Sequence, residues 1–257
     1  MFKKHVLAAS LGLLVPLTAF ADIRPFSFVK DVYPLGKGGI EYEQYHTWSF
    51  QTEGDNAFHE LQFKHELAFG VADNFDLAVY LPVWSYTHSK DGDVTKFEQV
   101  AVEGVVYLSS PVSDPIGVGL YAEAGAGEDS LAFEFKLLLQ KDIDNWVFAY
   151  NLVLETEVEG VFDETTENET EGVIENVFGA AYHLNDQLRV GGEGVIATEF
   201  PDWEEAEETS VYLGPMVGYD TELGNLMLNF VLTPLIQVTD VEEAARFKTR
   251  LLLEVEF

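Results

Sequence analysis

The chain has 257 residues, no cysteine and a formal net charge of −31, with 45 acidic residues against 14 basic ones. This balance argues against a nucleic-acid partner, because phosphate binding requires a basic face. The absence of cysteine is compatible with export but does not establish it, since disulfides are optional in exported proteins. Beyond the N-terminus no window of about 18 apolar residues is free of charge, so no membrane-spanning helix is predicted.

The first 21 residues have the pattern of a signal peptide. A basic start, Lys3-Lys4-His5, precedes an apolar core from Val6 to Leu17 and the small-residue cleavage pattern Ala19-Phe20-Ala21. The core is too short to cross a bilayer as a helix, which takes about 20 residues. We therefore expect residues 1–21 to be removed on export. Residues 22–38, rich in Pro and Gly and without a clear period, are expected to form a periplasmic lead-in. The sequence leaves open whether residues 22–37 plug the barrel.

From Gly39 to the C-terminus, apolar and polar residues alternate, which is typical of strands with two different faces. In the stretch from Phe75 to Val83, all odd-numbered apolar residues are expected to face outward. The last stretch is similar, with an apolar odd face and a mostly charged even face. The alternation predicts twelve strands, near residues 40–50, 58–71, 75–83, 99–108, 118–125, 131–140, 146–157, 173–184, 188–200, 211–219, 226–235 and 246–257.

The connections between these strands alternate in length. Short ones fall near 72–74, 109–117, 141–145, 185–187 and 220–225, and longer, acidic ones near 87–96, 158–172, 201–210 and 236–244. Short periplasmic turns alternating with longer extracellular loops are typical of outer-membrane barrels. Because no strand edge can stay unpaired in hydrocarbon, the sheet must close. The predicted fold is all-β: a closed antiparallel transmembrane β-barrel of about 12 strands over residues 39–257, with both termini in the periplasm.

Several stretches are similar to a group of outer-membrane barrel families. They are Gly39-Ile40-Glu41-Tyr42-Glu43-Gln44, the strand–turn–strand run 66–82 with Ala72-Asp73-Asn74 at its turn, residues 178–187, and Leu213-Gly214-Pro215. The sequence resembles the MetA-pathway-of-phenol-degradation proteins and related families over most of the mature chain. That resemblance implies a barrel that serves as a transporter, and it says little about the substrate. The final Phe257 resembles the C-terminal residue of such barrels and implies recognition by the barrel-assembly machinery.

Charged residues recur on the face opposite the apolar one, and a base there would cost about 2–4 kcal/mol if it faced lipid near the midplane. They are therefore expected in the lumen. The three basic residues of the last strand are expected to face acidic residues of strands 131–140 and 146–157 across the upper lumen. The predicted pore-lining residues are Arg246, Lys248, Arg250, Glu134, Lys136, Glu155, Glu157, Glu175, Glu193, Glu60 and Lys64.

Three polar residues, Gln44, His46 and His65, have the parity of the lipid-facing set. We expect a local bulge that reverses the parity there, with a protomer interface or a metal pair as the alternative. In the loop near His88, a lone His-Ser-Lys-Asp sequence is a poor signal for catalysis. The acidic loops lack the spacing and glycine of a calcium loop. We expect no enzyme, no cofactor and no bound metal.

The sequence thus predicts an exported protein in the outer membrane of a Gram-negative bacterium, surrounded by outer-membrane lipid. The predicted function is that of a porin-like passive channel for small solutes. The excess of acidic residues in the lumen favours cations. The alternative is a closed barrel, filled by its own ion pairs, with a structural or surface-interaction role.

Overall fold

The computed structural model describes residues 23–162, 168–203, 205–242 and 244–257. Among these residues the regular secondary structure consists of β-strands alone. The strands are β1 (Ile40–Phe50), β2 (His59–Ala72), β3 (Phe75–Tyr80), β4 (Trp84–Ser89), β5 (Gly92–Phe97), β6 (Val100–Ser109), β7 (Gly117–Ala126), β8 (Ser130–Ile143), β9 (Trp146–Glu159), β10 (Glu169–His183), β11 (Leu188–Pro201), β12 (Ser210–Leu223), β13 (Leu226–Gln237) and β14 (Phe247–Glu256).

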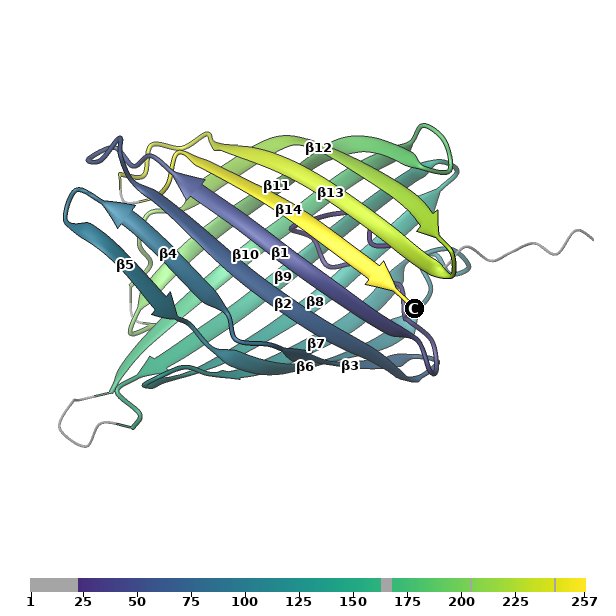
Figure 1. Cartoon of the computed structure of the whole chain (residues 1–257), viewed down its shortest axis with the longest axis horizontal. Coiled ribbons are helices and arrows are strands. Elements are labelled where there is room, and N and C mark those ends of the chain that lie inside the picture. The colour runs from purple at the N-terminus through teal and green to yellow at the C-terminus, as the bar shows by residue number, and fades with distance from the viewer. Residues whose placement is uncertain (1–22, 163–167, 204, 243) are drawn as a thin grey trace, which may run out of the picture.

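These strands form one antiparallel sheet that closes on itself as a barrel (Figure 1). The closure lies at β1, which pairs with β14 on one edge and with β2 on the other. From β1 the ring continues through β2, β3 and β6 and then in chain order from β7 to β14. The predicted all-β fold, a closed antiparallel barrel with a ring of 12 strands, is confirmed.

The remaining two strands, β4 and β5, extend one hairpin of the ring. β3 pairs with the second half of β2 and β4 with its first half, along the same edge. β6 pairs with β3, and β5 pairs with β4. The hairpin β4–β5 is therefore a continuation of β3 and β6 at the end of the barrel away from the C-terminus (Figure 1). The prediction of a loop over 87–96 is wrong, because most of these residues lie in β4 and β5.

The break between β3 and β4 reverses the alternation. Leu81 is 45% exposed on the outer face, whereas Val83, two residues later, is 3% exposed and lines the lumen. Pro82 separates them, and proline has no N–H to donate to a sheet. The prediction that Val83 faces outward is therefore wrong. A shift of one residue moves every later side chain to the other face.

The expected bulge at Gln44, His46 and His65 is absent. The pairing of β1 with β2 is unbroken from Ile40↔Phe69 to Phe50↔His59. These three polar side chains therefore remain on the outer face of the barrel.

Elsewhere the two faces of the sheet differ as the alternation predicted. Large apolar side chains such as Phe135, Leu154 and Leu232 are exposed on the outside, while carboxylates such as Glu103 are buried inside. An apolar belt around a closed barrel with a polar interior is the pattern required of a barrel surrounded by hydrocarbon. Among the described residues, no helix has the length and apolar character needed to cross a membrane.

Most of residues 23–38, which precede the first strand, lie inside the barrel at the end where the C-terminus lies (Figure 1), and Lys37 and Gly38 are exposed in the turn before β1. The sequence predicted a lead-in on the periplasmic side and left open whether it plugs the barrel. In the structure, Phe26 and Val29 are fully buried. The ring of Phe26 packs against the wall at Gly179, where a Cβ would lie only 2.6 Å from the ring. We call residues 23–38 the luminal segment.

Candidate functional site

The luminal segment is held to the wall first by one carboxylate. Glu193 of β11 accepts hydrogen bonds from the backbone N–H groups of Ser27, Phe28 and Val29, with N···O distances of 3.0, 2.7 and 3.1 Å. The Ser27 hydroxyl donates to the same carboxylate at 3.0 Å, and the hydroxyl of Thr233 donates at 2.5 Å. Successive N–H groups converging on one anion form the kind of concavity that binds anions elsewhere in proteins. Here the anion is part of the wall.

Other polar side chains of the wall pair with the rest of the segment's backbone. Asn151 of β9 accepts from Lys30 N at 2.7 Å and donates to Lys30 O at 2.8 Å. The side chain of Gln140 accepts from Val32 N at 2.9 Å. A segment without regular structure must pair its buried N–H and C=O groups in some other way. The wall therefore stabilises this path of the chain through the lumen.

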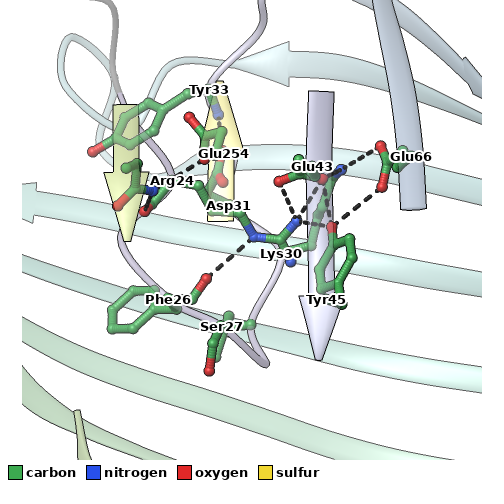
Figure 2. A network of polar contacts seen from close by, with 12 residues as sticks. Arg24, Phe26, Ser27, Lys30, Asp31, Tyr33, Glu43, Tyr45, Glu66 and Glu254 are labelled. Atoms are coloured by element: carbon green, nitrogen blue, oxygen red, sulfur yellow. Dashed lines mark hydrogen bonds and ion pairs between the residues drawn. The ribbon is translucent and has the colours of Figure 1, made fainter. Parts of the chain in front are cut away.

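Two cations of the segment lie against acidic residues of the wall (Figure 2). Arg24 binds Glu43 of β1 at 3.0 and 3.2 Å and donates to the Tyr45 hydroxyl at 2.5 Å. From another part of the wall, Arg189 of β11 donates to the carbonyl oxygen of Arg24 at 2.8 Å. It also pairs with Asp220. The start of the segment is thus fixed from two sides.

Lys30 lies among three carboxylates. Its Nζ atom is 3.2 Å from Glu103, 3.6 Å from Glu66 and 4.0 Å from Glu43. Burial by itself would lower the pKa of Lys30, but these carboxylates raise that pKa well above its ordinary value. The ammonium group therefore stays charged at neutral pH, and it offsets part of the negative charge that the wall carries.

A cavity of about 430 Å³ lies beyond the segment. Arg24, Phe28 and Lys30 contribute to its lining, and the rest of the lining comes from the strands. A smaller cavity of about 110 Å³, also lined by Arg24 and Lys30, reaches Glu256 near the C-terminus. Since both cavities share these two side chains, the segment lies between them.

The predicted pore-lining residues divide into three groups. Nine of them line the larger cavity: Lys248, Arg250, Glu134, Lys136, Glu155, Glu157, Glu175, Glu60 and Lys64. Glu193 faces the lumen but binds the luminal segment. Arg246 is exposed and is not part of the cavity lining.

Charges in the cavity are only partly paired. Lys136 binds Glu134 at 2.8 Å. In contrast, Lys248 lies over the ring of Tyr212 at 4.5 Å, and Arg250 lies over the ring of Phe28 at 4.2 Å. Among the described residues, neither of these two β14 cations has a carboxylate within 4.0 Å. Among the described residues, the β9 and β10 carboxylates of the lining likewise have no basic group within 4.0 Å. They are Glu155, Glu157 and Glu175.

The residues considered for chemistry other than transport lie apart from this cavity. His88 is in the exposed hairpin β4–β5, where it pairs with Asp93 and stacks on His59 at 5.0 Å. In the described part of the chain, no group of three or more His, Cys, Asp or Glu residues is arranged to hold a metal ion. Part of the acidic loop 163–171 falls outside the described residues.

Sequence reasoning missed the role of the luminal segment. Arg24, Ser27 and Lys30 have no alternating pattern, because they follow no strand. The only signal was three basic residues and several large apolar residues in a short stretch before a very acidic barrel. The basic side chains of such a stretch can pair with acidic residues of the wall, and its apolar side chains can be buried against the wall.

Comparison of the sequence with protein families decides the relationship. A family model described as a family of unknown function (DUF6662) matches residues 18–239. The chain belongs to the DUF6662 family. No curated protein matches the sequence.

Solved structures with a similar fold include outer-membrane proteins. The COG4313 outer-membrane channel from Pseudomonas putida F1 has a TM-score of 0.63 at 12% identity, over 88% of this chain and 98% of that one. The NanC porin has a TM-score of 0.52 at 9% identity, over 85% and 98%. The translocator domain of the autotransporter NalP from Neisseria meningitidis has a TM-score of 0.50 at 10% identity, over 86% and 88%. At such low identity the likeness shows the fold alone, so the resemblance seen in the sequence holds at the level of outer-membrane barrels.

Proposed function

We propose that this DUF6662 protein is a passive channel for small solutes in the outer membrane of a Gram-negative bacterium. The single observation that carries the proposal is the charged cavity of about 430 Å³ inside the closed barrel. A barrel interior with unpaired charges of both signs suits the passage of hydrated solutes, because the walls can replace part of their hydration. The channel and porin folds above are consistent with this role.

The channel is proposed to prefer cations modestly. Carboxylates outnumber bases in the cavity lining, where seven Glu residues face four Lys or Arg residues that the strands contribute. Low-dielectric walls focus the field of such charges into the lumen. The luminal segment adds Arg24 and Lys30, which weaken this preference without reversing it.

A closed barrel with a structural or surface-interaction role is the second candidate. The observation that favours it is the luminal segment, which is bound to the wall between the two cavities. Under either role the protein is proposed to be a non-enzyme, to use no cofactor and to be inserted by the barrel-assembly machinery through the strand that ends at Phe257. The proposed likeness to the MetA-pathway-of-phenol-degradation proteins concerns the fold and does not extend to their substrate.

Planar-bilayer recordings of the purified, folded protein distinguish the two roles. The channel proposal predicts discrete conductance steps and, across a salt gradient, a reversal potential of the sign that cations give. The absence of conductance from protein that shows heat-modifiable gel mobility would overturn the channel role. It would support the closed barrel.

A further inference from the structure

A chain of hydrogen bonds runs across the outer face of the barrel on β1 and β2. The hydroxyl of Tyr42 bonds Nδ1 of His65 at 2.8 Å, the side-chain amide of Gln44 donates to the same hydroxyl at 2.9 Å, and Nε2 of His46 bonds Oε1 of Gln44 at 3.3 Å. The rings of His46 and His65 lie 6.3 Å apart. We call these four residues the outer polar cluster.

The cluster lies at mid-height in the apolar belt. Gln44 and His46 are in the middle of β1 and pair in register with Leu253 and Leu251 of β14, which also face outward. Exposed Trp48 and Phe63 flank the cluster on the same face. Polar groups at this depth have no water to bond, so those inside membranes face protein or a water-filled cavity. This cluster faces neither within its own barrel.

The ends of the chain of hydrogen bonds are complementary. The Tyr42 hydroxyl accepts from Gln44 and has one proton to donate, and Nδ1 of His65 is its only acceptor among the described residues. The tautomer that satisfies both groups is the neutral His65 ring with its proton on Nε2. At the other end, His46 donates from Nε2, which leaves its Nδ1 as an acceptor. Among the described residues neither of these two ring nitrogens has a partner. The cluster therefore presents one free donor on β2 and one free acceptor on β1.

We propose that the outer polar cluster is the centre of an interface with a second copy of this chain. In a two-fold symmetric interface every contact occurs twice: if His65 of one copy meets His46 of the other, His46 of the first copy also meets His65 of the second. The donor at His65 and the acceptor at His46 can then pair twice across the axis. Each pairing removes two unsatisfied groups from hydrocarbon, where interhelical and interstrand polar contacts have little competition from water.

A comparison within the same barrel supports this assignment. Asn176 of β10 is also polar and faces outward, but it accepts from the Tyr150 hydroxyl at 2.7 Å in an isolated pair. Within the described part of the chain, Asn176 belongs to no longer series of hydrogen bonds that ends in a free donor and a free acceptor. Asn176 therefore serves as the matched control, because it is another polar residue on the outer face. The proposal depends on the barrel lying in a membrane and not on its conducting solutes.

Crosslinking in the native outer membrane tests the proposal. Since the chain has no cysteine, a single introduced thiol gives an unambiguous reporter. Leu251→Cys places it beside His46, and Phe135→Cys places it on β8, on the far part of the ring. A short bismaleimide should give a product of twice the chain mass from Leu251→Cys and none from Phe135→Cys.

Removal of the polar cluster should then reduce the dimer. Added to Leu251→Cys, His65→Leu should lower the dimer yield at least tenfold, whereas Asn176→Leu should leave it unchanged. Gln44→Leu, which interrupts the series of hydrogen bonds at its centre, should lower the dimer yield as His65→Leu does. Each variant is accepted only with heat-modifiable gel mobility. No dimer, equal yields from both thiol positions, a heavier product containing another protein, or yields unaffected by His65→Leu and Gln44→Leu would overturn the proposal.

Discussion

Replacement of Glu193 by glutamine should release part of the luminal segment. The wild-type carboxylate binds five donors, three of them successive backbone N–H groups. Glutamine keeps one carbonyl oxygen, which can retain the Ser27 and Thr233 bonds. Its NH₂ group then faces the N–H groups of Phe28 and Val29, which lose their acceptor.

The expected size of the effect follows from those two lost bonds. Hydrogen bonds to a charged group are worth about 1.5–3 kcal/mol each, and a buried donor without a partner costs a further amount. We take about 3 kcal/mol as the net loss, since local relaxation recovers part of the total. Each 1.4 kcal/mol is a factor of ten in an equilibrium constant, so the fraction of barrels with residues 27–29 displaced should rise about 100-fold.

Single-channel recording measures this change as more frequent or larger open events. The matched control is Glu157→Gln, which removes a carboxylate from the wall of the larger cavity. Among the described residues, Glu157 has no hydrogen bond to the luminal segment. It should alter ion selectivity but not the frequency of large openings. If Glu193→Gln leaves the open-event statistics of the wild type unchanged, Glu193 does not hold the segment in place.

Three further outcomes are expected. Leu251→Arg should impair insertion, because a base facing lipid near the midplane costs about 2–4 kcal/mol. Insertion is measured by heat-modifiable gel mobility, and the control Arg250→Leu should fold. Equal defects in both variants would show that the lipid-facing and luminal faces of β14 are wrongly assigned. Neutralising Lys248 and Arg250 together with glutamine should shift the reversal potential toward stronger cation selectivity. Arg246→Gln is the control and should not do so, because Arg246 is outside the cavity lining. An epitope tag between residues 163 and 167 should be labelled on intact cells, and labelling only after outer-membrane rupture would reverse the proposed orientation.

The barrel could be predicted from sequence because each strand lies between two different environments. On β14, Leu251 and Leu253 face outward while Arg250 and Glu254 face the lumen. A membrane barrel imposes this alternation on every strand, so the pattern is repeated many times along the chain and single exceptions do not hide it. For the same reason nine of the eleven predicted pore-lining residues are found in the cavity wall.

The errors arise where alternation carries no information. Pro82 interrupts a strand, and the parity then shifts, which a two-residue period cannot anticipate. At His46 the sequence pattern conflicts with a lipid-facing position, and a bulge was the simplest resolution. The structure instead keeps the strand regular and joins the polar side chains to one another. The path of the luminal segment depends on contacts between residues more than 100 positions apart, such as Ser27 with Glu193.

The acidity of the barrel and the position of the luminal segment are physically connected. Glu43, Glu66 and Glu103 converge on Lys30, so complete withdrawal of the segment would leave three buried carboxylates without that cation. Burial of unpaired charge is costly. Displacement of residues 27–29 alone leaves one buried carboxylate, Glu193, without most of its donors, whereas complete withdrawal leaves Glu193 and the three carboxylates around Lys30 in that state. An opening that moves residues 27–29 while Lys30 stays paired has the lower free-energy cost, and it would widen the lumen on the β11 side only.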